Sequence, residues 1–423
     1  MRRCTLAYAA LCSLCSCAAE LHRPTSGPCQ APNATQLLLN ANNSLTFVDF
    51  TPGPAYDTAA DGRARPLRLG PIAIGSKAVL SYPDPERFAG ADAGFAQLSH
   101  RTFVYDQALA LLWATQRGDR TLARGLAQTL EALQNQDGSW GFSFSAQGDG
   151  YYNAGYVCTG AVAWCLYALA VYQQRGDDPA ALAVLHKGLN WLLLQVDSDT
   201  DLVLAGRGRW RNGAHFEPDW PAEFAATEHQ IDAWFALMAA AKVPRIINSN
   251  KLLQTANRVA AASDNQLWRE AQGRYAEGLA NGLQDPISAL DASGTWAALW
   301  DVARGRPERA ERSLAWVEAH HRREVLGWPA YVPYVPGQPD TWFVEGSLAI
   351  ALVWQRLGQP ERARAALQPH LELACSGGLP LVYSPRWATD FPLAPAAAPT
   401  LWFAMVVGEV LGQPSLLWQA LQP

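Results

Sequence analysis

Two kinds of helical segment alternate along the chain from about residue 100 onward. Each unit of roughly 50 to 60 residues begins with a segment that is apolar on nearly all sides and ends with an amphipathic segment whose charges share one face. A helix that is apolar all round is buried on both sides, whereas an amphipathic helix covers the outside of a core. The pattern therefore predicts paired helices, each pair with an inner and an outer member.

Six such pairs fit the sequence, joined by short turns in which Gly closes one helix and Pro sets the first turn of the next. The expected inner segments are 105–112, 155–173, 227–241, 291–303, 342–356 and 400–411. The expected outer segments are 122–134, 180–194, 251–264, 308–320 and 361–373, with a short helix after Pro414 completing the sixth pair.

Six helical hairpins in a row describe a closed double ring. Over residues 101–423 the chain resembles the six-hairpin, (α/α)6 toroid superfamily, which includes many glycoside hydrolases and some polysaccharide lyases. The resemblance implies an all-α toroid domain. Residues 20–100 differ, because they hold Gly, Pro and short β-like runs such as 44–50 and 70–80, and we expect a linker and an irregular N-terminal arm there.

The first 19 residues are typical of a signal sequence, with Arg2 and Arg3 before an apolar run and then small residues. The stretch 14–17 resembles a bacterial lipobox, which would make Cys17 the lipidated first residue; cleavage after Ala19 is the alternative. Both interpretations predict export, as a periplasmic protein or membrane-anchored lipoprotein in a bacterium and otherwise as a secreted protein. The only expected contact with a membrane is this lipid anchor.

Composition excludes several function classes. A formal charge of −5 and 17% charged residues provide no basic field for nucleic acid. Beyond the signal sequence the chain has no CxxC pair, and it has no nucleotide-binding loop. It also has no HExxH motif, since Arg322 and Arg323 follow His320 and His321. The acidic run 197–201 lacks the Gly and the distal Glu of an EF-hand. We therefore expect neither a metal nor a cofactor.

Polar groups that open the inner helices are the candidate chemistry, because the resemblance implies that those helix ends meet at one mouth of the ring. The predicted catalytic carboxylates are Asp106, Glu228, Asp232, Asp291 and Glu345. The predicted sugar-binding residues are Tyr105, Tyr151, Tyr152, His229, Trp342 and Trp402. Glycosidic cleavage needs a protonated acid and a second carboxylate, which such a set supplies. Capping explains a lone carboxylate in a first turn equally well, and His229 fits a core histidine.

Hydrolysis of a poly- or oligosaccharide is the leading hypothesis, and three alternatives remain open. A polysaccharide lyase would use Tyr105 or His229 as base and the arginines of 207–211 to hold an acidic sugar. A non-catalytic glycan-binding or envelope-assembly protein would keep the aromatic residues and tolerate loss of the carboxylates. The stretch 134–140 resembles the Gln-Trp motif of triterpene cyclases, but the acidic run 197–201 follows an outer helix. The oligomeric state is left open.

Overall fold

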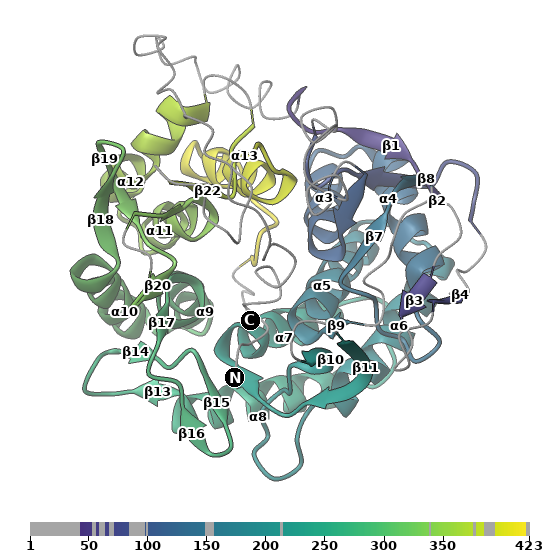
Figure 1. The fold of residues 1–423 in the computed structure, drawn as a ribbon, viewed down its shortest axis with the longest axis horizontal. Helices are drawn as coiled ribbons and strands as arrows, with labels where there is room; N and C mark the ends of the chain where they lie inside the picture. Colours follow the sequence, from purple (N-terminus) through teal and green to yellow (C-terminus); the bar gives the residue numbers. More distant parts are fainter. Residues whose placement is uncertain are drawn as a thin grey trace.

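The computed structural model describes residues 43–419 apart from 53–55, 59–63, 67–71, 84–97, 99, 149–155, 212–214, 338–339, 375–377 and 385–393. Helices surround a common centre (Figure 1), and each inner helix contacts the next around the ring, with the last returning to the first. The inner members are α3 (Val104–Gln116), α5 (Thr159–Arg175), α7 (Thr227–Ala240), the π-helix η3 (Leu290–Thr295) continued by α9 (Trp296–Ala303), α11 (Val344–Arg356) and α13 (Ala397–Val410). The outer members are α4 (Arg120–Leu133), α6 (Pro179–Leu194), α8 (Ser249–Gln266), α10 (Pro307–His320) and α12 (Pro360–Leu373). The predicted (α/α)6 toroid is confirmed.

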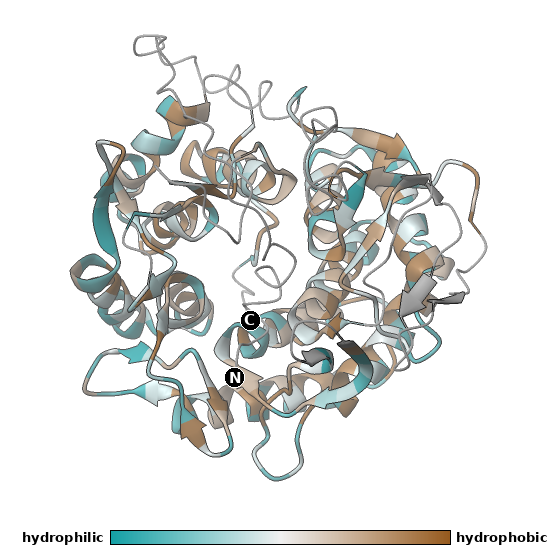
Figure 2. Cartoon of the chain, viewed as in Figure 1, coloured by the Kyte–Doolittle hydropathy of each residue, from teal (hydrophilic) through white to brown (hydrophobic). Residues whose placement is uncertain are grey.

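Burial separates the two rings as the sequence pattern requires. Every residue of α5 from Thr159 to Val171 is buried, whereas α10 buries only Ala310, Ser313, Leu314 and Val317. Figure 2 shows the same division, with hydrophilic colour concentrated on the outer helices. The inner helices therefore form the core, and the outer helices shield it from water.

The hairpin turns follow the expected Gly and Pro rule. Gly118, Gly305 and Gly358 each adopt a φ of +72°, a conformation that costs other residues a steric clash. Pro179, Pro307 and Pro360 begin α6, α10 and α12. These turns set the antiparallel pairing of inner and outer helices.

The sixth pair differs from the expectation. Residues 411–419 form turns and irregular backbone, so the predicted short helix after Pro414 is wrong for the described part of the tail. A short helix is marginal in water unless packing supports it, and here Leu416, Leu417 and Trp418 are all buried, which a helix with one outward face would not allow. The tail instead runs toward the middle of the ring (Figure 1).

Short strands lie at the entrances to the inner helices. β6 (Arg101–Phe103), β9 (Val157–Cys158), β12 (Ala225–Ala226), β17 (Ser288–Ala289) and β21 (Trp342–Phe343) directly precede α3, α5, α7, η3 and α11. They pair with β7 (Ser143–Ser145), β10 (Gly206–Arg211), β15 (Gly278–Ala280), β20 (Tyr334–Val335) and β22 (Val382–Tyr383), respectively. The remaining strands are β2 (Thr51–Pro52), β3 (Tyr56–Thr58), β4 (Ala64–Pro66), β8 (Gln147–Gly148), β11 (His215–Ala222), β13 (Trp268–Arg269), β14 (Arg274–Tyr275), β16 (Leu283–Gln284), β18 (Arg322–Val325) and β19 (Trp328–Tyr331), besides the two described next. The ladders fix the backbone just before each inner helix begins.

The N-terminal arm packs on the first hairpin. β1 (Phe47–Asp49) pairs antiparallel with β5 (Lys77–Val79), and β5 contacts both α3 and α4. The buried amide of Gln107 joins them, because its Nε2 donates to the carbonyl oxygen of Lys77 at 2.9 Å and its Oε1 accepts from the N–H of Val79 at 3.2 Å. Residues 1–19, including Cys17, lie outside the described residues. Among the described helices, none combines the length and apolar character that a bilayer span requires.

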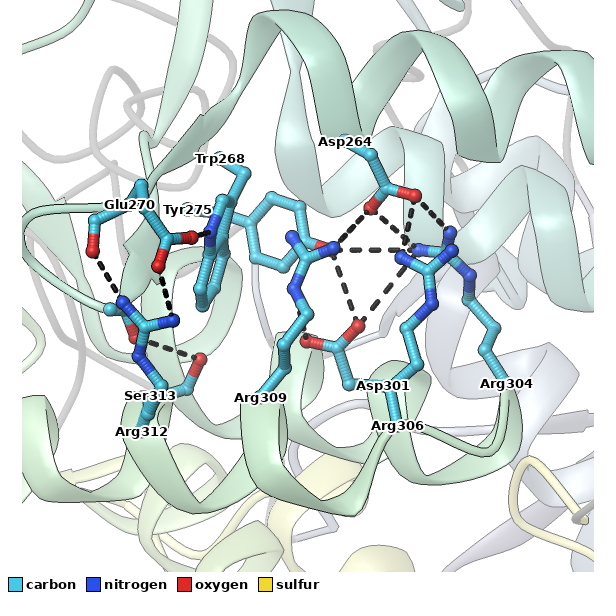
Figure 3. A network of polar contacts seen from close by, with 11 residues as sticks. Asp264, Trp268, Glu270, Tyr275, Asp301, Arg304, Arg306, Arg309, Arg312 and Ser313 are labelled. Carbon is cyan, nitrogen blue, oxygen red and sulfur yellow. Dashed lines mark hydrogen bonds and ion pairs between the residues drawn. The ribbon is translucent and has the colours of Figure 1, made fainter.

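A network of charged side chains ties the third hairpin to the fourth (Figure 3). The carboxylate of Asp264, near the end of α8, accepts from Arg304, from Arg306 at 2.6 Å and from Arg309 at 2.9 Å. These arginines hold the pKa of Asp264 below its usual value. Asp301 lies fully buried beneath them, and burial raises the pKa of its carboxyl to about 6 although the arginines oppose that rise. The network is structural, because it links α8 with the α9–α10 turn.

Candidate active site

A cavity of about 820 Å³, counting its open mouth, lies where the inner helices begin. Its lining combines carboxyl groups with aromatic rings, and the lining residues are Tyr105, Phe142, Cys158, Gly160, Ala161, Trp164, Glu228, His229, Asp291, Trp296, Pro333, Tyr334, Phe343, Glu345 and Leu381. An apolar pocket with a few convergent polar groups is the usual form of a small-molecule site. The cavity is therefore the candidate active site.

One helical position supplies most of the polar wall. The second residue of α3, α5, α7, η3 and α11 is Tyr105, Gly160, Glu228, Asp291 and Glu345, and all five line the cavity. Each stands two residues after one of the short strands that precede the inner helices. The strand ladders thus place the same position of five helices at one point, which is why carboxylates far apart in sequence meet.

Helix capping does not account for Glu228 and Glu345. Neither α7 nor α11 has a side-chain cap, and within the described residues the carboxyl group of Glu228 makes no hydrogen bond. Glu345 accepts from Tyr105 instead of from a backbone N–H. Asp291 does accept the backbone N–H of Ala292, at 2.6 Å. The two glutamates therefore lie in first turns without accepting a hydrogen bond from the free backbone N–H groups there, so helix capping does not explain them.

A chain of hydrogen bonds orients Glu345. The indole N–H of Trp402 donates to the hydroxyl oxygen of Tyr105 at 2.6 Å, and the hydroxyl of Tyr105 donates to Oε1 of Glu345 at 2.5 Å. All three side chains are buried. Tyr105 is thus held from behind by Trp402 while it fixes one oxygen of Glu345 at the cavity wall.

Burial raises the pKa of every carboxyl group in this cluster, and nearby negative charges add to the rise. The pKa of Glu345 rises to about 8 through burial first, against the opposing hydrogen bond from Tyr105. Burial raises the pKa of Asp291 to about 6, and the bond from Ala292 limits that rise. The pKa of Glu228 lies well above its usual value because of burial and then the charge of Asp291. Environments that separate the pKa values of neighbouring carboxyl groups provide both an acid and a base at one pH.

A thiol and an imidazole also meet at the cavity wall. Sγ of Cys158 lies 3.3 Å from Nε2 of His229, whose Nδ1 is buried without a hydrogen-bond partner among the described residues. Gly160 permits this contact, since a Cβ there would lie 2.6 Å from Cδ2 of His229 and 2.7 Å from Oδ2 of Asp232. His229 is therefore a cavity residue with one ring nitrogen free.

Four predicted residues lie behind the cavity wall or away from it. Asp106 and Asp232 are 3% and 1% exposed and do not line the cavity, although burial raises the pKa of both carboxyl groups, that of Asp106 to about 7. Trp402 is fully buried behind Tyr105. Trp342 belongs to a separate cluster with Val325 and Ala330, and donates to Ser347 at 2.9 Å, so a sugar does not reach its ring. Tyr151 and Tyr152 lie outside the described residues.

Sequence reasoning missed Cys158, Trp164 and Trp296. The sequence predicted that the second inner helix begins at residue 155, whereas α5 begins at Thr159. Candidate site residues for that helix were therefore chosen from positions before its true start. Glu228 and Glu345 are the second residues of their helices, and the same position in α5 is Gly160. With the correct helix start, the sequence would have pointed to Gly160 and its neighbours. Trp164 and Trp296 carried no signal that separated them from other buried tryptophans.

Residues invoked by the alternative hypotheses lie elsewhere. Arg207 pairs with Asp137, and Arg209 pairs with Glu217 at 2.5 Å, so neither lines the cavity. Asp197 accepts the N–H of Thr200 at 2.8 Å in a local turn. Trp140 donates to Leu130 at 2.7 Å, and Gln134 donates to Val184 at 2.9 Å, so the 134–140 stretch staples α4 to α6. No cluster of three or more metal-ligating side chains occurs in the part of the chain that the structure describes.

Comparison with known proteins finds the fold but no sequence family. No family model and no curated protein matches the sequence. Solved structures do match: a D-mannose isomerase at 11% identity and a TM-score of 0.59, covering 91% of this chain and 99% of that one. A glycosidase matches at 13% identity and a TM-score of 0.60, covering 81% and 94%. An unsaturated glucuronyl hydrolase specific for heparin matches at 12% identity and a TM-score of 0.53, covering 91% and 97%. At such identities these likenesses show the toroid fold.

Proposed function

We propose that the protein is a carbohydrate-active enzyme that hydrolyses a glycosidic bond in a poly- or oligosaccharide. The observation that carries the proposal is the cavity wall, where Glu228, Asp291 and Glu345 line the same cavity as Trp164 and Trp296. Aromatic rings stack on the apolar faces of sugars, while carboxyl groups bind hydroxyls and move protons. The solved structures of like fold, which include a glycosidase, an unsaturated glucuronyl hydrolase and a D-mannose isomerase, support a sugar as the ligand.

Different carboxyl groups suit the two roles of hydrolysis. Asp291, with a pKa of about 6, is ionised at neutral pH and serves as base or nucleophile. Burial and the charge of Asp291 raise the pKa of Glu228, which favours its protonated form. Its side chain is only half-buried and makes no hydrogen bond within the described residues, so it can donate a proton to the leaving oxygen. Glu345 stays neutral near pH 7 and is oriented by Tyr105 toward sugar hydroxyls.

The charge of the cavity disfavours a lyase. A lyase acting on an acidic sugar needs a cation to neutralise the sugar carboxylate before a proton is removed. No Lys or Arg appears among the described residues that line the cavity. Three carboxyl groups instead suit a neutral or cationic sugar.

Isomerisation or epimerisation of a free sugar is a second candidate. The specific observation in its favour is His229, which lines the cavity with Glu228 and whose buried Nδ1 has no hydrogen-bond partner among the described residues. A base of this kind can move a proton between neighbouring sugar carbons. The two candidates differ in their products, since hydrolysis adds water and isomerisation leaves the mass unchanged.

A product screen tests the proposal. Protein lacking residues 1–19 is incubated with a panel of oligosaccharides, polysaccharides and free sugars, and products are read by mass and by absorbance of unsaturated ends. We expect products that have gained water, with Glu228→Gln and Asp291→Asn each lowering turnover at least about 100-fold. Glu308→Gln is the matched control, because Glu308 is exposed at the same second position of an outer helix, α10. Turnover kept in both cavity variants would refute the assignment.

We also propose, from residues 1–19 alone, that the enzyme acts outside the cytoplasm. Mass spectrometry of the mature N-terminus tests this proposal. Diacylglycerol on Cys17 would support the lipoprotein, and a free Glu20 at the N-terminus would support ordinary cleavage after Ala19. An intact N-terminus in the native host would contradict export.

A further inference from the structure

The C-terminal tail is latched to the ends of several inner helices. Gln116, the last residue of α3, accepts the backbone N–H of Leu416 at 2.8 Å, and the hydroxyl of Tyr167 donates to the carbonyl of Leu416 at 2.8 Å. Arg356, the last residue of α11, donates to the carbonyls of Leu417 and Trp418, both at 2.6 Å. These bonds fix the tail in the middle of the ring, although a sixth outer helix was expected from this part of the sequence.

Arg356 is itself held in place. It forms a bidentate ion pair with Glu409 near the end of α13, at 2.8 and 2.9 Å, and its side chain is 9% exposed. A planar guanidinium that bonds one carboxylate and two carbonyls fixes all of their positions at once. The described tail is therefore held in a defined position against the inner helices.

The latch delivers Trp418 into an aromatic cluster at the centre of the ring. Its ring stacks on Trp164 at a centroid distance of 4.7 Å and on Phe235 at 4.8 Å. It meets Trp296 edge to face at 5.2 Å and Trp402 at 5.9 Å. Trp418 is fully buried, and its indole N–H has no partner among the described residues. A buried unpaired donor is unfavourable, so the position is specified by the shape of the ring system.

Trp418 approaches the cavity from the side opposite its mouth. The carboxyl groups lie in the first turns of the inner helices, whereas the tail is bonded to the last residues of α3 and α11. Phe235, which Trp418 stacks on, follows Glu228 by seven residues, or about 10 Å along the helix axis. Trp164 and Trp296 line the cavity and both contact Trp418. Trp418 thus supports the cavity floor from below.

We propose that the Trp418 plug makes the cavity a dead end that admits the terminal unit of a sugar chain or a free monosaccharide. An internal segment of a chain must leave its site in two directions, and the plug closes one end of the ring. The recessed carboxyl groups, with Asp291 8% and Glu345 3% exposed, reach only a unit that enters the pocket. This inference rests on the proposed function, because it specifies which part of a sugar chain that site takes.

Product lengths test the dead end in the wild-type protein. An oligosaccharide that the product screen identifies as a substrate is followed at early conversion. Release of terminal units alone, with an end-blocked or cyclised form of the same oligosaccharide left uncut, is expected. Internal fragments, or cutting of the cyclised form, would overturn the inference while leaving hydrolysis in place.

Binding tests it without turnover. Saturation-transfer NMR with glucose, mannose, galactose and N-acetylglucosamine is expected to detect at least one free monosaccharide, and Trp418→Ala should weaken its binding about tenfold. Trp418→Phe keeps an aromatic floor and should weaken binding about threefold; it also serves if the alanine variant fails to fold. Trp140→Phe, a buried tryptophan between outer helices, is the control that leaves binding unchanged. Binding of no monosaccharide, or equal binding by both Trp418 variants and the wild type, would overturn the inference. Monosaccharide binding without hydrolysis of any glycan would refute the proposed function alone.

Discussion

Replacing Glu345 with glutamine should stabilise the protein at neutral and alkaline pH while removing a group from the site. Glutamine has the shape of the protonated acid, and its amide oxygen still accepts the hydroxyl proton of Tyr105. The variant differs from the wild type mainly in that it cannot ionise. The difference in unfolding free energy between the two proteins therefore isolates the cost of keeping this carboxyl group buried.

The magnitude follows from the pKa of Glu345, which burial raises from 4.5 to about 8. Between those two pH values the folded protein keeps a proton that the unfolded chain has lost. The free energy of unfolding of the wild type must then fall as pH rises, by about 1.4 kcal/mol per pH unit for this one group. By pH 7 the accumulated difference is about 3 kcal/mol, and it levels off above about pH 8.

Urea denaturation of both proteins from pH 4 to pH 9 provides the measurement. We expect the two stabilities to differ least near pH 4, where the glutamate is protonated in both states, and then to diverge in favour of Glu345→Gln. Glu308→Gln, on an exposed outer helix, should show no such divergence. Stability curves that stay parallel across this range would refute the reasoning, because they would mean that Glu345 ionises as readily in the fold as in water.

Three further results are expected. Asp264→Asn should lower the free energy of unfolding by about 3 kcal/mol in urea titrations at pH 7, because three arginines lose the carboxylate that they share. This difference from the wild type should shrink below about pH 4, because the wild-type carboxylate of Asp264 is then itself protonated. Gly160→Ala should cost about 1–3 kcal/mol and lower turnover, because its methyl group would lie 2.6 Å from the ring of His229, whereas Gly176→Ala meets nothing closer than 3.9 Å and should not. Finally, kcat/KM should fall as pH drops through about 6, where Asp291 takes up a proton, and a flat acid limb would exclude it as the base.

The ring of helices was predictable because its signals are local. The alternation of all-apolar and one-faced segments, with Gly and Pro between them, fixed which helices are inner and outer, and α7 begins at Thr227 as expected. The same local phase brought Glu228, Asp291 and Glu345 to the cavity. Where the phase was misjudged by four residues, in α5, the residues that face the cavity were missed. The sequence therefore identified the carboxylates of the cavity wherever it placed the start of the inner helix correctly.

The roles of the tryptophans were not predictable, because the depth of a side chain depends on contacts between distant segments. In the sequence, Trp342 and Trp402 lie near the starts of inner helices, as the cavity residues do. In the structure, Trp342 packs with Val325 and Trp402 lies behind Tyr105. Trp418 lies in the stretch for which a short helix was predicted, and nothing within that stretch indicates that Arg356 binds it. The hydrogen bond from Arg356 to the carbonyl of Trp418, 62 residues away in the sequence, holds this tryptophan beneath the cavity. In the proposed dead-end pocket, the residue that limits which sugars enter is therefore the one whose local sequence says least about function.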